Sequence, residues 1–119
     1  MAYKELEVAP VKNGGEKGFA FEYAVTLAAI SNGDWLIIPD DIKSIAVTLS
    51  FTDSAEGKVQ TTTDKVETVK LGSPVAVDWT SGVVSATTSD ATSPVTALRL
   101  SQTSIGGGSG TVKMTLRAQ

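Results

Sequence analysis

The chain has 119 residues, 41% of them hydrophobic and 19% charged, which is enough for one globular domain with its own core. Its net charge of −3 argues against a nucleic-acid partner, because phosphate-binding surfaces depend on clustered Lys and Arg. Cys and His are both absent, which excludes disulfides, thiolate metal sites and an imidazole general base. We therefore expect no catalytic residue, no metal and no cofactor.

The first 18 residues are polar, rich in glycine, and without the apolar segment of a secretion signal. We expect residues 1–18 to form an N-terminal arm or an edge strand, in which Leu6 and Val8 are the strand-forming positions. The arm is either a frayed end or a clasp that orders against a neighbouring subunit through Tyr3, Leu6 and Val8. No apolar run is long enough to span a bilayer, so we expect a soluble chain without a membrane partner.

The first segment with a regular pattern covers residues 19–30. Its apolar residues recur at period two, from Phe19 to Ala29, which is typical of a strand with one dry face. The alanines would also allow a helix, but the aromatic and β-branched residues favour a strand.

Two further strands are predicted before residue 52. Residues 35–38 form a short buried strand that ends at Pro39, and Asp40 and Asp41 follow as a corner rather than a calcium site. The clearest central strand covers residues 42–51, and its inward positions are Ile45, Val47, Leu49 and Phe51.

The middle of the chain alternates between β-branched runs and turn residues. Residues 52–57 form a loop of hairpin length, and residues 89–93 form a second loop. The strands predicted between them cover residues 58–63, 65–70, 75–79 and 83–87.

The last 27 residues read as two strands around the glycine-rich sequence S-I-G-G-G-S-G. Val112, Met114 and Leu116 alternate with polar residues in the second strand. We expect an antiparallel hairpin whose flexible tip is the glycine run. A phosphate-binding loop is not indicated, because neither a helix nor a Lys-Ser/Thr pair follows the glycines.

Together these elements predict about nine short strands with turns every 8–12 residues. The predicted fold is an all-β, single-domain antiparallel β-sandwich or jelly roll over residues 19–119, without a long helix.

Trp79 and Asp90 are the candidate contact residues of the domain itself. Trp79 ends a strand in V-D-W-T-S-G, where it is either partly exposed or caps the core, and Asp90 lies at a predicted loop tip. If exposed, Trp79 and Trp35 would form a sugar-binding platform.

The segments V-D-W-T-S-G-V-V-S-A-T-T-S-D (77–90) and P-V-T-A-L-R-L-S-Q-T-S-I-G-G-G-S-G-T-V-K-M-T-L-R-A-Q (94–119) resemble the small β-rich structural proteins of tailed bacteriophage virions. The resemblance implies a non-enzymatic virion component, made in the host cytoplasm. It implies a head decoration (cement) protein, or else a tail, neck or fibre-base protein. Its partners would be the major capsid protein or other virion proteins, and it would form a homo-oligomer such as a trimer. A carbohydrate-binding module is the alternative from another class.

Overall fold

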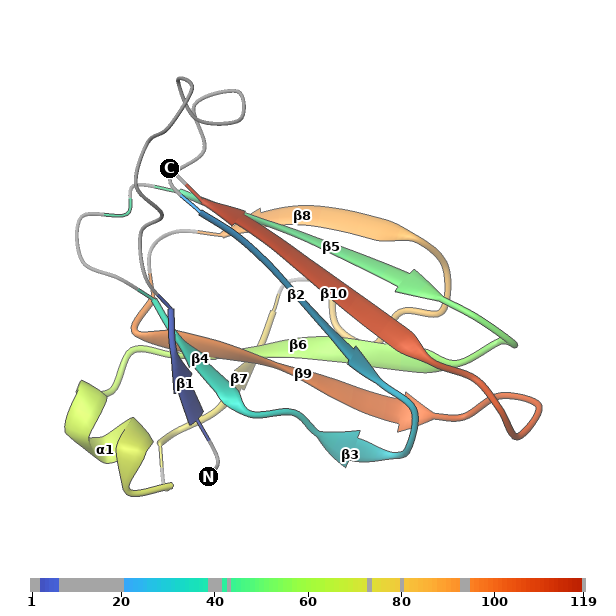
Figure 1. Cartoon of the computed structure of the whole chain (residues 1–119), viewed down its shortest axis with the longest axis horizontal. Coiled ribbons are helices and arrows are strands. Elements are labelled where there is room, and N and C mark those ends of the chain that lie inside the picture. The colour runs from blue at the N-terminus through green and yellow to red at the C-terminus, as the bar shows by residue number, and fades with distance from the viewer. Residues whose placement is uncertain are drawn as a thin grey trace.

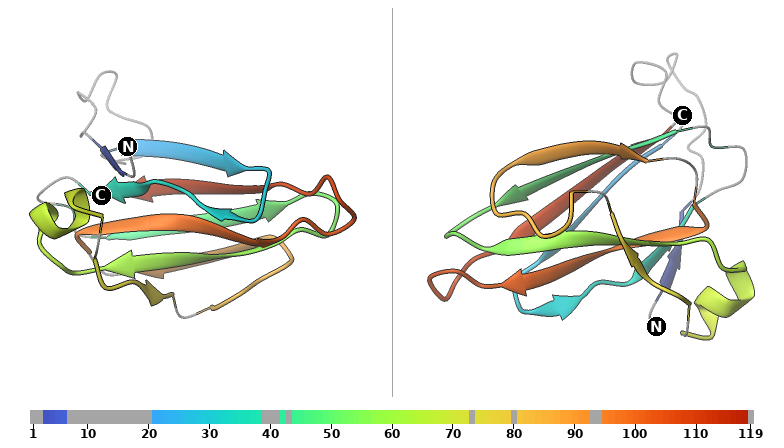
Figure 2. Two further views of the ribbon diagram at one scale, coloured as in Figure 1. Left: turned by 90° about the horizontal axis from the view of Figure 1, so that it is seen from below. Right: turned by 180° about the vertical axis from the view of Figure 1, so that it is seen from behind.

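The computed structural model describes residues 3–6, 21–38, 42, 44–72, 74–79, 81–92 and 95–118. Two β-sheets lie face to face and enclose one core, which confirms the predicted all-β sandwich (Figures 1 and 2). The elements in chain order are β1 (Tyr3–Glu5), β2 (Phe21–Leu27), β3 (Ser31–Asn32), β4 (Trp35–Ile37), β5 (Ile45–Phe51), β6 (Glu56–Thr62), α1 (Val66–Lys70), β7 (Val77–Asp78), β8 (Thr88–Thr92), β9 (Ala97–Ser104) and β10 (Val112–Ala118).

The first sheet, here called sheet A, has the strand order β1-β4-β9-β6-β7, and β3 also pairs with β9. The second, sheet B, has the order β2-β10-β5-β8. Neighbouring strands are antiparallel, apart from β1 and β4, which run parallel.

The core lies between β5 and β10 of sheet B and β6 and β9 of sheet A. Ile45, Val47 and Leu49 of β5 are at most 1% exposed, as the period-two pattern predicted. They pair in register with the buried row of β10, in which Met114 stands opposite Leu49. Burial of these side chains supplies most of the stability, at about 25 cal/mol per Å² of apolar surface removed from water.

Strand β2 confirms the strand interpretation over the helical one for residues 21–27, whereas residues 28–30 lie outside the strand and residues 19–20 outside the described part. Tyr23, Val25 and Leu27 are half-buried and pack on the core, whereas Ala24 and Thr26 are exposed. Strand β4 is buried along its whole length, as predicted.

The predicted closing hairpin is wrong. Strand β9 belongs to sheet A and β10 to sheet B, so the glycine-rich loop crosses from one layer to the other (Figure 1). The loop after β5 does the same, since β6 lies in sheet A. Each of these strands has an apolar face that is covered by the opposite sheet. A period-two pattern shows this face but does not show whether two successive strands pair in one sheet or lie in opposite sheets.

The strand predicted at residues 65–70 is also wrong, because residues 66–70 form helix α1. Val66 and Val69 are three residues apart and therefore lie on one face of the helix. Val69 is completely buried against Trp35, Ile37 and Ala97 on the outer face of sheet A. This tertiary contact overrides the β-propensity of the valines and Thr68.

The assignment of residues 83–92 needs a similar correction. In the predicted strand at 83–87, only Val84 makes a bridge, to Gly57. The strand lies instead at β8, where a loop was predicted, and pairs antiparallel with β5 from Thr88 opposite Leu49 to Thr92 opposite Ile45. Pairing with β5 decides the strand, because the central Ser-Asp-Ala of β8 carries little strand signal of its own and only the two flanking threonines favour it.

Residues 3–6 of the N-terminal segment pack against their own subunit. Strand β1 forms the edge of sheet A beside β4, and the Leu6 amide donates to the Ile37 carbonyl at 2.9 Å. Val8, Asp40 and Asp41 lie outside the described residues.

Candidate functional site

The outer face of sheet A carries the richest set of polar side chains in the described part of the chain. Helix α1 covers one end of this face over Trp35 and Ile37. Beyond the helix, outward-pointing residues of β3, β6 and β9 line a shallow, open depression of about 520 Å³. Its lining includes the polar residues Asn32, Lys58, Gln60, Arg99, Ser101 and Thr103.

Arg99 lies at the boundary between the apolar contact with α1 and this depression. Its guanidinium carbon lies 4.5 Å from the centroid of the Trp35 ring, and its Nε donates to Gln60 Oε1 at 2.8 Å. Partial burial lowers the pKa of Arg99 from its usual value, but the group stays charged at neutral pH. Its terminal nitrogens have no hydrogen-bond partner among the described residues, so they are free to bind an acceptor.

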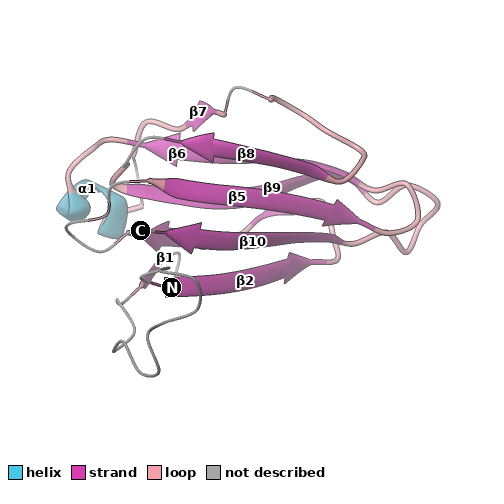
Figure 3. Cartoon of the chain, turned by 90° about the horizontal axis from the view of Figure 1, so that it is seen from above, coloured by secondary structure: helices cyan, strands magenta, loops and turns pink. Residues whose placement is uncertain are grey.

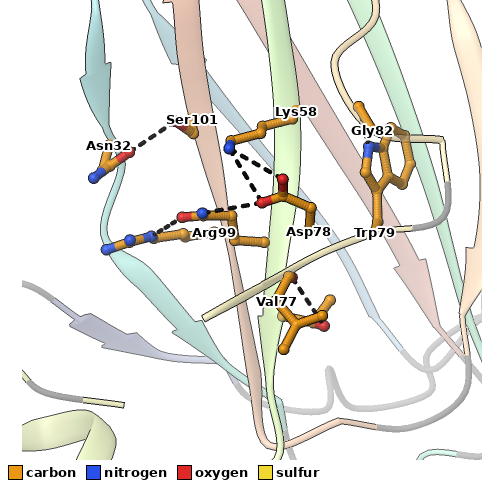
Figure 4. Close-up of polar contacts among 10 residues, drawn as sticks. Asn32, Lys58, Val77, Asp78, Trp79, Gly82, Arg99 and Ser101 are labelled. Atoms are coloured by element: carbon orange, nitrogen blue, oxygen red, sulfur yellow. Dashed lines mark hydrogen bonds and ion pairs between the residues drawn. The ribbon is translucent and has the colours of Figure 1, made fainter. Parts of the chain in front are cut away.

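Lys58, Gln60 and Asp78 form a neutralised cluster beside Arg99 (Figure 4). Lys58 Nζ lies 3.1 Å from Asp78 Oδ1, to which Gln60 Nε2 also donates at 3.2 Å. The hydrogen bonds from Gln60 and then from Lys58 lower the pKa of Asp78 below its usual 3.8. The cluster attaches the two-residue strand β7 to β6.

Asn32 is oriented by a single contact, in which Ser101 Oγ donates to Asn32 Oδ1 at 2.7 Å. The Asn32 amide nitrogen remains a donor and lies on the same side as the tip of Arg99 (Figure 4). Arg99 has no acidic partner among the residues that the structure describes, whereas Lys58 is paired with Asp78. The arrangement is suited to holding an acidic group by charge-assisted hydrogen bonds. Among the described residues, no three His, Cys, Asp or Glu side chains meet to hold a metal ion.

The structure places the predicted contact residues elsewhere. Trp79 is 8% exposed and lies in the core, where its Nε1 donates to the Gly82 carbonyl at 2.7 Å. It therefore caps the core instead of offering a contact surface. Trp35 is 2% exposed, so the sugar platform that required both rings at the surface is excluded.

The residues predicted to form a clasp lie in different environments. Leu6 is 8% exposed and packs into its own core, so its side chain is not available to a neighbouring subunit. Tyr3 is half-buried beside α1, with Lys70 Nζ 5.8 Å from its ring centroid. Asp90 lies within β8, opposite Val47, and not at a loop tip.

Sequence reasoning missed the depression and most of its residues. One signal was present: Leu98 and Leu100 point inward on β9, so Arg99 and Ser101 must share the outer face. Nothing local indicated that β3, β6 and β7 would surround them.

No known protein family, curated protein or solved structure matches this chain. In the part of the chain that the structure describes, no helix has the length and hydrophobicity needed to cross a membrane.

Proposed function

We propose that this protein is a non-enzymatic structural component of a tailed-phage virion, a head decoration (cement) protein that binds the capsid shell. Two features support the proposal: the resemblance in residues 77–90 and 94–119, and an all-β sandwich with four large exposed apolar side chains within a short stretch of its sequence. The protein would be located in the virion, with the major capsid protein as its partner.

The observation that carries the proposal is the distribution of exposed apolar side chains. Within residues 71–83, Leu71, Val75, Val77 and Val83 are 83, 67, 58 and 52% exposed. Concentrations of exposed apolar side chains mark protein–protein contact sites more often than isolated ones do. We call this segment the apolar margin. It includes β7, an edge strand of only two residues.

A weak contact of this kind suits a protein present in many copies. One copy gains little free energy from two or three valines, about 0.8 kcal/mol for each buried CH₂ group. Copies that also contact one another on a lattice dissociate far less readily, because each bound copy raises the effective concentration of the next contact.

Co-sedimentation with heads of the phage that encodes the chain tests the proposal. The variant V75S/V77S replaces two side chains of the apolar margin without changing the core. We expect the wild type to sediment with the heads and the variant to stay in the supernatant. Ile30→Ser is the matched control, because Ile30 is 65% exposed but lies outside the margin. Wild-type protein that never sediments with heads would refute the proposal.

The copy number in purified virions separates a head protein from the tail, neck or fibre-base alternative. A decoration protein follows the capsid lattice in hundreds of copies, whereas an adaptor forms a single ring of low cyclic symmetry.

A further inference from the structure

The outer strands of the two sheets differ greatly in how well their free edges are protected. In sheet A the edges are β1, with three residues, and β3 and β7, with two each. Such short strands present few free backbone groups, which is a common way to prevent edge-to-edge association. In sheet B the edges are β8, with five residues, and β2, with seven.

Strand β2 lacks the usual protective features of an edge. Its sequence F-E-Y-A-V-T-L contains no proline, no lysine and only one charged residue. Its pairing with β10 runs without interruption from Val112 opposite Leu27 to Ala118 opposite Phe21, so no bulge twists the edge away. Figure 3 shows β2 along one margin of sheet B, with no further described strand beside it.

The side chains of β2 are also incompletely buried. Tyr23, Val25 and Leu27 pack against the core yet remain half-exposed, and among the described strands β2 has a neighbour on one side only. On the opposite face, Ala24 and Thr26 are small and exposed, so they leave room for another strand to approach. A strand added here would bury a row of apolar side chains and satisfy the free backbone groups of the edge.

We propose that β2 is a self-association edge, which pairs antiparallel with β2 of a second copy of this chain. The two copies are related by a twofold axis through Ala24, so the same seven residues serve on both sides. The two four-stranded sheets then become one continuous sheet.

A second copy fits this edge better than an unrelated strand because β2 is complementary to itself. With Ala24 opposite Ala24, Tyr23 stands opposite Val25 of the second copy, and Phe21 stands opposite Leu27. Aromatic and β-branched residues are favourable cross-strand pairs. The charged residue Glu22 stands opposite Thr26 of the second copy, so like charges do not meet.

Beta-strand pairing over seven residues is about 24 Å long, at roughly 3.4 Å per residue. A contact made by one strand pair of this length buries less surface than the roughly 1,600 Å² of a standard interface. The dimer is therefore reversible, and its population rises with protein concentration. It requires no phage shell, so it stands or fails independently of the function proposed above.

Sedimentation equilibrium of charge variants at Ala24 tests the register directly. Ala24→Lys and Ala24→Glu each place like charges opposite each other on the twofold axis, and we expect each variant alone to be monomeric. An equimolar mixture of the two restores a dimer, because opposite charges then meet. Ala46→Glu is the matched control, since Ala46 is exposed on β5 inside the same sheet, and it should dimerise like the wild type.

Cross-linking supplies a second measurement that does not depend on charge. The chain has no cysteine, so Ala24→Cys introduces a single thiol. Opposed residues of antiparallel strands have Cα atoms about 4.5–5.5 Å apart, within the range that a disulfide spans. Under mild oxidation Ala24→Cys should form a covalent dimer much faster than Ala46→Cys does.

Two outcomes would overturn the proposal. One is wild-type protein that stays monomeric at every concentration tested. The other is a dimer that Ala24→Lys and Ala24→Glu leave unchanged and that Ala24→Cys fails to cross-link faster than Ala46→Cys.

Discussion

Gly106 lies directly against the backbone of Asp53, so that a Cβ atom at position 106 would collide with the Asp53 carbonyl oxygen. The two residues belong to the two loops that connect sheet B with sheet A. Gly107 N donates to the same carbonyl at 3.1 Å, and Ser109 N donates to Asp53 Oδ2 at 3.2 Å. The glycine-rich loop is therefore a defined structure that holds the other crossing in place.

Gly106→Ala should destabilise the fold strongly. Gly106 has φ of 57°, a left-handed conformation that costs alanine about 1–2 kcal/mol, and the collision adds to this cost. We expect a loss of about 3 kcal/mol or more in the free energy of unfolding, measured by urea titration.

Gly82→Ala is the control for this prediction. Gly82 has a similar φ of 64° but nothing within 4 Å of an added Cβ, so only the backbone cost of about 1–2 kcal/mol applies. Equal losses in the two variants would show that the loops do not lock each other.

Gln102 is the buried polar residue that joins β9 to the crossing loop. It is 1% exposed, and its Nε2 donates to the carbonyls of Ser104 at 3.1 Å and Gly110 at 2.9 Å. Gln102→Glu replaces both donors by a buried carboxylate that faces two carbonyl oxygens. We expect a loss of about 3–5 kcal/mol at neutral pH, because the charge has no partner.

Acid should restore part of that loss, because a protonated carboxyl can donate to one of the carbonyls. Gln102→Met removes the same donors without adding charge, so its cost of about 1–3 kcal/mol should not depend on pH. If Gln102→Glu showed the same pH profile as Gln102→Met, the buried donor role would be wrong.

The ionised Asp78 side chain should contribute to the free energy of unfolding, and this contribution should be lost in acid. Its pKa is lowered in the folded state by Gln60 and Lys58, whereas the unfolded chain has the ordinary value of 3.8. The unfolded state therefore binds more protons in this range, and the contribution is present above pH 3.8 and lost as pH falls through the folded pKa.

Urea unfolding of wild type and Asp78→Asn from neutral pH to about pH 2 measures this contribution. The difference between them should shrink in acid, and it should remain small throughout because Asp78 is solvent-exposed. A difference that is constant with pH would contradict the assignment.

Replacing Arg99 should change the fluorescence of Trp35. Removing the guanidinium in Arg99→Ala exposes the ring that it covers, at a cost of about 1 kcal/mol. In a Trp79→Phe background, where Trp35 is the remaining tryptophan, we expect its fluorescence emission to shift to longer wavelength. Ser101→Ala is the control and should leave the emission unchanged, because Ser101 lies on the same face but its hydroxyl bonds to Asn32.

The depression around Arg99 illustrates what could be predicted about the site. The alternation on β9 already placed Arg99 and Ser101 on the outer face. Asn32 is 69 residues from Ser101, and Gln60 is 39 residues from Arg99. Asp78 is 18 residues from Gln60, and no local pattern encodes any of these contacts. The burial of Trp79 was one of two interpretations, and only the packing of Val59 and Val84 into the same core selects it.

The residues by themselves determined that this chain is a β-sandwich, because period two on β5 and β10 is a local consequence of strand geometry and of burial on one face. They also favoured a strand over a helix for the segment that forms β2. Only the tertiary structure decided that β9 and β10 lie in different sheets, that residues 66–70 turn into a helix and that β8 begins at Thr88. In each of these cases the decisive free energy comes from a contact with a distant segment, which a local pattern does not contain.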